Sequence, residues 1–218
     1  MISLAALAIA GSSSAAFIGY DVQNAGTVGG LTKWVLFGQF TAGSTDTVLN
    51  AFHFNKTVGG GNPVFWHNDA LSGAASTVAG TWNPQFVLAP GAMDSYVCIG
   101  GGEGFASGNS TNADPDWGAA GFNQAQVPFL AAGTTTSGAG WFNGNPPNLQ
   151  GRVDASGKVK LGQFVIGSND PSATLFLKVG FNNGQGGSVV FGEGTFTIPA
   201  PGAIALLGLA GLAGRRRR

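Results

Sequence analysis

Charged residues and cysteine are scarce in this chain. Only 9% of its 218 residues are Asp, Glu, Lys or Arg, and Cys98 is the one cysteine, so no internal disulfide can form. Cys98 lies in the apolar stretch 95–99 with no histidine nearby in the sequence. This setting predicts a small buried hydrophobic residue rather than a catalytic nucleophile.

Sequence motifs of common enzymes are missing as well. The chain holds no G-x-S-x-G, no H-E-x-x-H and no phosphate-binding loop, and neither His53 nor His67 has a partner at metal-ligand spacing. Asp114 and Asp116 are two residues apart, but a glycosidase needs two carboxyl groups placed across a cleft. We therefore predict that the protein is not an enzyme. Polysaccharide cleavage is the one catalytic class that we keep as an alternative.

Glycine dominates what is present. The 38 glycines, together with many Asn, Thr, Ser and Phe residues, favour strands joined by tight turns over helices. Outside the two ends of the chain, no segment has an apolar period of 3.6 residues. The candidate strands, separated by Gly, Asn and Pro, are 17–22, 33–41, 48–54, 63–66, 85–88, 95–99, 160–166, 174–181 and 188–198. They predict an all-β domain at 17–198, a single jelly-roll-like β-sandwich with long glycine- and asparagine-rich loops.

The stretch 100–148 is long, polar and rich in glycine, with few strand signals. Loops of this length are usually functional or disordered, and the aromatic residues here argue against full disorder. Side-chain oxygens at alternate positions suit Ca²⁺, although asparagine and aspartate in turns more commonly bond their own backbone. The calcium candidates are Asn112, Asp114 and Asp116, with Asn109 and Glu103 as further oxygen donors.

Tryptophans in the same stretch suggest a sugar-binding surface. A Trp face stacks on the CH groups of a sugar while neighbouring Asn and Asp side chains bond its hydroxyls. Trp117, Trp141 and Asn143 are the candidates, with Trp66 and Trp82 less central. The alternative is that these rings plug the open end of the sandwich, where large aromatics contribute most burial.

The C-terminal segment 199–218 differs in character from the rest of the chain. Pro199-Ala200-Pro201 precedes the apolar run 202–214, which includes Leu206 and Leu207, and the run is followed by Arg215, Arg216, Arg217 and Arg218. As a helix the run would span about 20 Å, against about 30 Å for the hydrocarbon core of a bilayer. It can enter a membrane but is short for a permanent span, and the arginines would stay on the cytoplasmic side.

This order of proline motif, apolar run and arginine cluster resembles the PEP-CTERM sorting signal of bacteria. Pro199, Pro201 and Arg215–Arg218 match the motif, and Ala200 replaces its glutamate. The resemblance implies export, transient membrane insertion as a short hydrophobic helix, and recognition and cutting by an exosortase-type membrane protease. The destination that it implies is the cell surface or the exopolysaccharide matrix. An uncut C-terminal membrane anchor is the alternative reading of the same segment.

The other end of the chain is consistent with export through the secretion machinery. Residues 1–10 are apolar and are followed by small residues, which resembles a secretory leader with a cut after Ala16, although no positive charge precedes the apolar stretch. Loss of the four terminal arginines would reduce Lys+Arg from 10 to 6 against 10 Asp+Glu, a net charge of −4. That charge disfavours nucleic acid as a partner.

We therefore expect an exported cell-surface or matrix protein of structural or adhesive type, with a signal peptide at 1–16 and a sorting segment at 199–218. Its alternative is a non-catalytic carbohydrate-binding module. No cofactor is expected apart from the calcium considered above.

Overall fold

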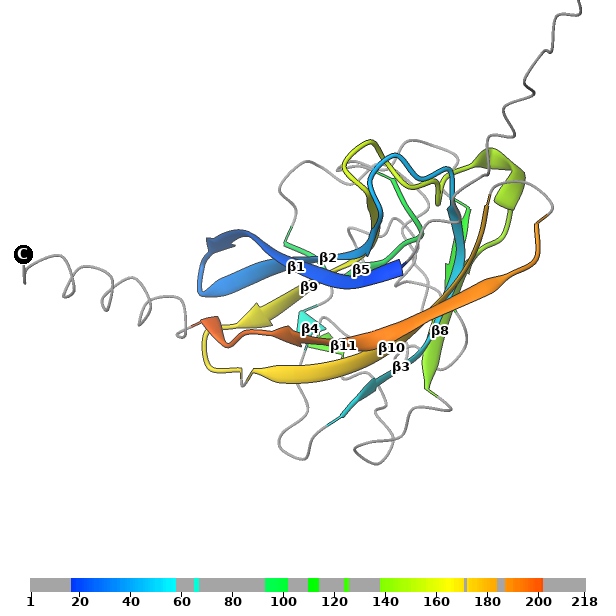
Figure 1. Cartoon of the computed structure of the whole chain (residues 1–218). Coiled ribbons are helices and arrows are strands. Elements are labelled where there is room, and N and C mark those ends of the chain that lie inside the picture. The colour runs from blue at the N-terminus through cyan, green and yellow to red at the C-terminus, as the bar shows by residue number, and fades with distance from the viewer. Residues whose placement is uncertain are drawn as a thin grey trace, which may run out of the picture.

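The computed structural model describes residues 17–57, 65–66, 93–101, 110–113, 124–125, 138–170, 172–183 and 187–201. Their strands form two antiparallel sheets, seen as two layers in Figure 1 with β1, β2 and β9 in one and β3, β8, β10 and β11 in the other. The predicted all-β class is confirmed. The predicted leader and the predicted C-terminal hydrophobic helix lie outside the described residues.

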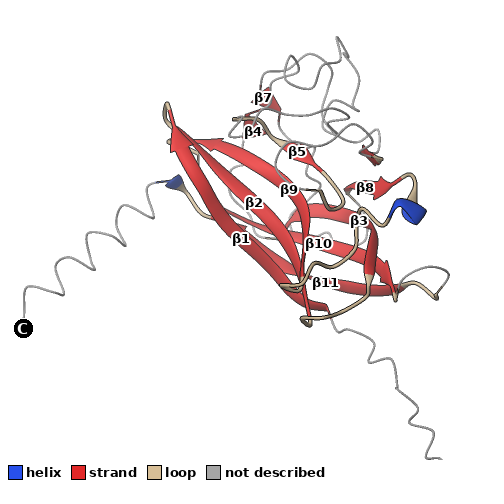
Figure 2. Cartoon of the chain, turned by 90° about the horizontal axis from the view of Figure 1, so that it is seen from above, coloured by secondary structure: helices blue, strands red, loops and turns tan. Residues whose placement is uncertain are grey.

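The first sheet has the strand order β1-β2-β9-β4-β7, and β5 also pairs with β9. Strands β2 and β9 begin and end within two residues of apolar stretches that the sequence pattern marks, β1 extends well beyond its predicted end, and β4, β5 and β7 are very short. Figure 2 shows these three short strands near one end of the molecule. The bounds are β1 (Phe17–Val28), β2 (Leu31–Phe40), β9 (Lys158–Gly167), β4 (Phe65–Trp66), β7 (Gln124–Ala125) and β5 (Tyr96–Val97).

The second sheet has the order β11-β10-β3-β8-β6. Neighbouring strands pair antiparallel throughout, and the ladder between β10 and β3 contains two register shifts. His53 lies at one of these shifts with a left-handed φ of 58°. The bounds are β11 (Val190–Ile198), β10 (Ala173–Asn182), β3 (Thr47–Lys56), β8 (Ala139–Asn143) and β6 (Thr111–Ala113).

The loop prediction for 100–148 needs correction. This stretch contains β6, β7 and β8 and the short 3-10 helix η2 (Pro146–Asn148), and it supplies two of the five strands of the second sheet. These strands have two to five residues, too few for a period-2 pattern to stand out. The candidate strand 85–88 lies outside the described residues.

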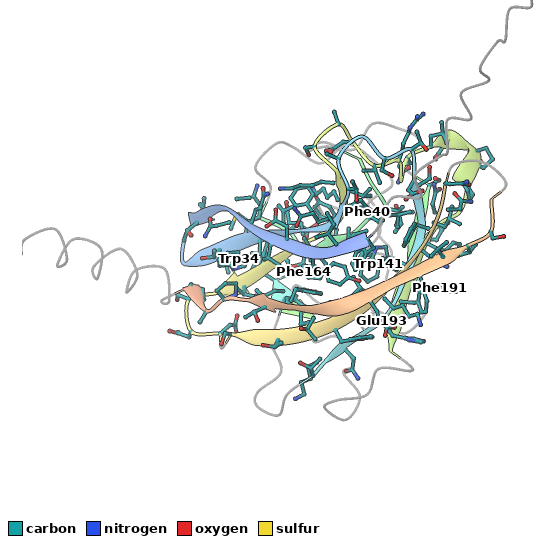
Figure 3. The ribbon with its side chains drawn as sticks, viewed as in Figure 1. Trp34, Phe40, Trp141, Phe164, Phe191 and Glu193 are labelled. Carbon is teal, nitrogen blue, oxygen red and sulfur yellow. The ribbon has the colours of Figure 1, made fainter. Side chains whose placement is uncertain are left out.

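One hydrophobic core lies between the two sheets. Phe54 of β3 stacks on Phe164 of β9 with ring centroids 5.4 Å apart, and Phe40 of β2 meets Phe181 of β10 edge-on at 5.1 Å. Each ring removed from water contributes about 1.5–3 kcal/mol to folding. Figure 3 shows Trp34, Phe40, Trp141 and Phe164 between the layers.

The edge strands β1 and β11 close one side of this core. Phe17 and Tyr20 of β1 lie over Gly192 and Gly194 of β11, and the Tyr20 hydroxyl donates to the carbonyl of Leu177 at 2.8 Å. Burial raises the pKa of Tyr20 well above its usual value, with the nearby Glu193 adding to the effect. The first and last long strands of the chain thus contact each other.

Candidate functional site

Trp141, a predicted sugar-stacking residue, is buried. Its side chain is 1% exposed, its ring meets Phe54 edge-on at 5.8 Å, and its Nε1 donates to the carbonyl oxygen of Cys98 at 2.9 Å. A ring enclosed on both faces cannot stack on a ligand. The structure therefore corrects this assignment, and Trp141 serves the core.

Asn143 is likewise occupied inside the protein. Its Oδ1 accepts a bond from the backbone N–H of Asn145 at 2.9 Å, and its Nδ2 donates to Oδ1 of Asn148 at 3.1 Å. Ser110 and Gln150 complete this amide network, in which Ser110 Oγ also contacts Asn143 Oδ1. The network joins β8 to the segment before β6, so the predicted role of Asn143 in sugar binding is also corrected.

The remaining sequence candidates are mostly outside the described residues, including Trp82, Trp117, Asn109, Glu103, Asp114 and Asp116. Trp66 is half-buried in β4. Asn112 is in β6, where its Nδ2 donates to the carbonyl of Ser110 at 3.3 Å. Within the described ranges no group of three or more His, Cys, Asp or Glu side chains is placed to hold a metal ion.

Cys98 is fully buried, as the sequence predicts. Its Sγ lies 3.7 Å from the carbonyl oxygen of Lys160, and burial raises the pKa of the thiol to about 12. A thiol that stays protonated is a poor nucleophile. Cys98 is therefore a packing residue in this fold.

The outer face of the first sheet carries buried polar side chains. Lys160 Nζ donates to the Tyr96 hydroxyl at 2.6 Å, and Gln163 Nε2 donates to the carbonyl of Asp94 at 2.7 Å. All four residues are less than 9% exposed. The four bonded atoms are thus satisfied by protein contacts, and their residues do not form an open surface.

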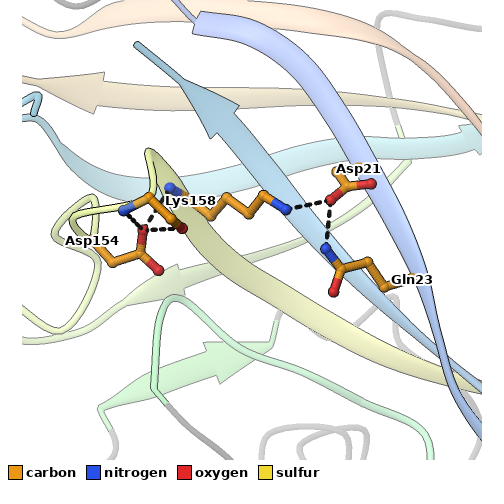
Figure 4. A network of polar contacts seen from close by, with 5 residues as sticks. Asp21, Gln23, Asp154 and Lys158 are labelled. Atoms are coloured by element: carbon orange, nitrogen blue, oxygen red, sulfur yellow. Dashed lines mark hydrogen bonds and ion pairs between the residues drawn. The ribbon is translucent and has the colours of Figure 1, made fainter. Parts of the chain in front are cut away.

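Asp21 and Lys158 form an ion pair at the accessible part of the same face. Lys158 Nζ reaches over β2 to Asp21 Oδ2 at 2.7 Å, and Gln23 Nε2 bonds the same oxygen at 2.7 Å (Figure 4). The hydrogen bond from Lys158 lowers the pKa of Asp21, so this carboxylate is charged at neutral pH. Asp154 accepts backbone bonds from Ser156 and Lys158 and holds the turn before β9.

The outer face of the second sheet is different, because it exposes aromatic rings. Register pairs between neighbouring strands connect one row of residues across all five strands: Phe191 (β11), Gly180 (β10), Asn50 (β3), Phe142 (β8) and Asn112 (β6). Phe191 is 55% exposed and Phe142 is 45% exposed. We call this row, with its neighbours Phe52, Lys178 and Glu193, the aromatic face.

Contacts within the aromatic face hold its rings in place. Phe52 meets Phe191 edge-on at 5.9 Å, and Lys178 Nζ lies 5.2 Å from the centre of the Phe191 ring. Lys178 also pairs with Glu193 at 3.2 Å in the next register row. Figure 3 shows Phe191 and Glu193 away from the core aromatics, on the outside of the second sheet.

Glycine at the centre of the row makes room for an amide. Asn50 Oδ1 accepts a bond from the backbone N–H of Gly180 at 3.0 Å, and a Cβ at Gly180 would lie only 2.3 Å from that oxygen. The Asn50 side chain can therefore lie across β10 because residue 180 has no side chain. This leaves a row that alternates between aromatic and amide groups.

Sequence reasoning missed the aromatic face, although one signal pointed to it. Side chains alternate between the two faces of a strand, so a buried Trp141 requires its neighbour Phe142 to point outward. Nothing in the sequence, however, pairs Phe142 with Asn50 or Gly180 with Phe191. That alignment arises from register between strands that are far apart in the chain.

Comparison with known proteins gave no match to a protein-family model, a curated protein or a solved structure. Within the described part of the chain, no helix has the length and apolar character required to cross a bilayer. The aromatic face is suited to reversible binding, because it combines exposed rings with amide groups and a neutralised charge pair.

Proposed function

We propose that this chain is an exported cell-surface or extracellular-matrix protein with a structural or adhesive role, sorted by its C-terminal segment. The supporting observation is that the last strand ends at Ile198, immediately before Pro199 and Pro201. Ile198 is 1% exposed and belongs to the core, whereas Pro199 is half-buried. A cut near Pro199 would leave every described core residue in the released protein.

The N-terminal boundary supports the same proposal. Strand β1 begins at Phe17, directly after the expected leader cut, and the Phe17 ring contacts Tyr20 and Phe40 at centroid distances of 5.0 and 5.5 Å. The folded part therefore has its own contacts from the first residue after the cut. Removal of 1–16 would not take away any of these described contacts.

The proposed partners follow from the two terminal segments. The secretion machinery would carry the chain across the inner membrane, and 202–214 would insert there briefly until an exosortase-type protease cuts. Export to the exopolysaccharide matrix follows, with no nucleic-acid partner and no catalytic role. The jelly-roll-like sandwich remains part of this proposal, and the shared core between two antiparallel sheets supports it.

A carbohydrate-binding module is the second candidate, and the aromatic face favours it. Of the residues assigned to sugar binding from the sequence, Trp141 and Asn143 are buried and Trp117 lies outside the described residues, but Phe142 and Phe191 are exposed on an open sheet. Calcium binding by Asn112, Asp114 and Asp116 remains a prediction for this module. Polysaccharide cleavage has no geometric support from the described residues, because the carboxylates considered for it lie outside them.

The sorting proposal is tested by deleting 199–218 in the native host. We expect the shortened protein to be absent from the cell surface. For the full chain, we expect intact-mass analysis of the protein recovered from the surface to show loss of 1–16 and 199–218. A second variant with Gln at all four positions 215–218 keeps the apolar run and removes its basic end. Unchanged size and destination in both variants would contradict the proposal.

A further inference from the structure

We propose that the aromatic face binds a neutral polysaccharide chain that lies across the strands of the second sheet. The rings of Phe142 and Phe191 would stack on sugar rings, and the amides of Asn50 and Asn112 would bond hydroxyl groups. This inference rests on the proposed function, because a protein in the extracellular matrix would meet polysaccharide there. The neutral polysaccharide would be the partner of the aromatic face.

The spacing of the row fits an extended chain of linked rings. Phe191 and Phe142 are three strands apart, about 14 Å at the usual strand spacing, and Asn112 extends the row to about 19 Å. Asn50 lies between the two phenylalanines. Aromatic and amide groups are therefore presented along one line, as a linear polymer requires, rather than around a closed pocket.

Exposure of these rings is unusual within the described residues. Only six large hydrophobic side chains there are exposed, and the two phenylalanines among them are both on this face. Rings of this size normally contribute their burial to the core, so rings held in solvent on a sheet are binding candidates. The contacts of Phe191 with Phe52 and Lys178 order its ring before a ligand arrives, which lowers the entropic cost of binding.

The charge pattern selects a neutral ligand. Lys178 and Glu193 are the charged residues of the face, and they pair with each other at 3.2 Å. The face therefore has no net charge to attract nucleic acid, an anionic lipid surface or an acidic polysaccharide. Uncharged hydroxyl groups, in contrast, can form hydrogen bonds with the amides of Asn50 and Asn112.

Both amides retain hydrogen-bonding capacity within the described part of the chain. Asn50 uses its Oδ1 for Gly180, which leaves its NH₂ group as a donor. Asn112 uses its Nδ2 for Ser110, which leaves its Oδ1 as an acceptor. One donor and one acceptor on either side of the Phe142 ring suit a sugar, whose hydroxyl groups both donate and accept.

Retention of the full-length chain on polysaccharide tests the proposal. The chain is held in a detergent without a sugar head group and mixed with insoluble cellulose, insoluble β-1,3-glucan or starch granules. We expect retention on at least one of these neutral polymers, and we expect it to persist in 0.5 M salt, because a neutral ligand is not screened. Absence of retention on all three would overturn the inference.

Variants identify the surface that binds. Phe191→Ala and Phe142→Ala should each weaken retention about tenfold, as loss of a central aromatic contact typically does, whereas Phe191→Tyr keeps a stacking ring and should bind nearly normally. Val28→Ala, which removes a comparably exposed apolar side chain at the end of β1 in the other sheet, is the matched control. Equal retention of all four variants would contradict a site on this face.

Two further readouts separate the alternatives. Light scattering that shows a dimer lost in Phe191→Ala would assign the face to a second copy of the chain and would overturn the polysaccharide assignment. Because retention is measured with purified protein, it does not depend on sorting in the cell. Binding with unchanged destination after tail deletion would refute the sorting proposal alone, and correct sorting without binding would refute this inference alone.

Discussion

At the scale of single residues, the neighbours Trp141 and Phe142 have opposite environments. Trp141 is 1% exposed and donates to the Cys98 carbonyl, while Phe142 is 45% exposed on the aromatic face. The sequence pattern indicates Trp141 and Asn143 as sugar-binding candidates, and residue type alone does not show that both side chains are buried. Strand alternation, once one ring is known to be buried, assigns the other to solvent.

Substitution of these two residues should have very different effects on stability. Trp141→Ala leaves a cavity and an unpaired carbonyl, so we expect the free energy of unfolding to fall by about 3–5 kcal/mol. Phe142→Ala removes an exposed ring and should change it by less than about 1 kcal/mol. Urea denaturation of both variants measures the difference. Similar losses would show that Trp141 is not a core residue.

At the scale of elements, β1 and β11 depend on small residues for their contact. The Phe17 ring lies over Gly192, where a Cβ would be 2.4 Å from ring atoms and 2.7 Å from the Phe17 Cβ. At Gly194 the nearest atom to such a Cβ is on the Tyr20 ring, 3.7 Å away. The two glycines of one strand thus have unequal steric roles, which a glycine-rich sequence cannot reveal.

Alanine at these two positions provides a matched test of the β1–β11 contact. Gly192→Ala forces the ring and its Cβ to move, and we expect a loss of about 1–3 kcal/mol in the free energy of unfolding. The alanine Cβ of Gly194→Ala fits at ordinary contact distance, so its free energy of unfolding should be within about 1 kcal/mol of that of the original protein. The lower conformational entropy of the unfolded chain adds a small stabilising effect. Thermal or urea unfolding compares them. A costlier change at Gly194 would contradict the described packing.

Strand length and strand partners were predictable to different degrees. The apolar segments of β2, β3, β9 and β10 are found within two residues of their observed ends, because their patterns extend over many positions. Strand β1 continues to Val28, well beyond its predicted end, through an irregularity between Asn24 and Thr27. Asn-Ala-Gly at 24–26 is typical of a turn, and only pairing with β2 continues the strand through it.

At the scale of the whole molecule, the described core ends where the proposed sorting segment begins. Phe196 and Ile198 of β11 are 6% and 1% exposed and belong to the core between the sheets. Strand β11, which directly precedes the C-terminal segment 199–218, therefore also contributes side chains to the core.

Two deletions should distinguish these roles. Removal of 199–218 should change the free energy of unfolding by less than about 1 kcal/mol, since no described core residue is lost. Removal of 190–218 takes away β11 with two core side chains, each worth about 2–5 kcal/mol, which exceeds what a marginally stable domain tolerates. Circular dichroism and urea unfolding report the outcome. A stable protein without β11 would contradict its place in the core.

What the sequence alone determined are properties carried by adjacent residues. The all-β class, the positions of β2, β3, β9 and β10 and the burial of Cys98 follow from local periodicity and composition. Only the tertiary structure decided which residues share a surface: it buried Trp141 and Asn143, and it aligned Phe191, Asn50 and Phe142 on an open sheet. The physical reason is register, because pairing between distant strands is set by the packing of the common core.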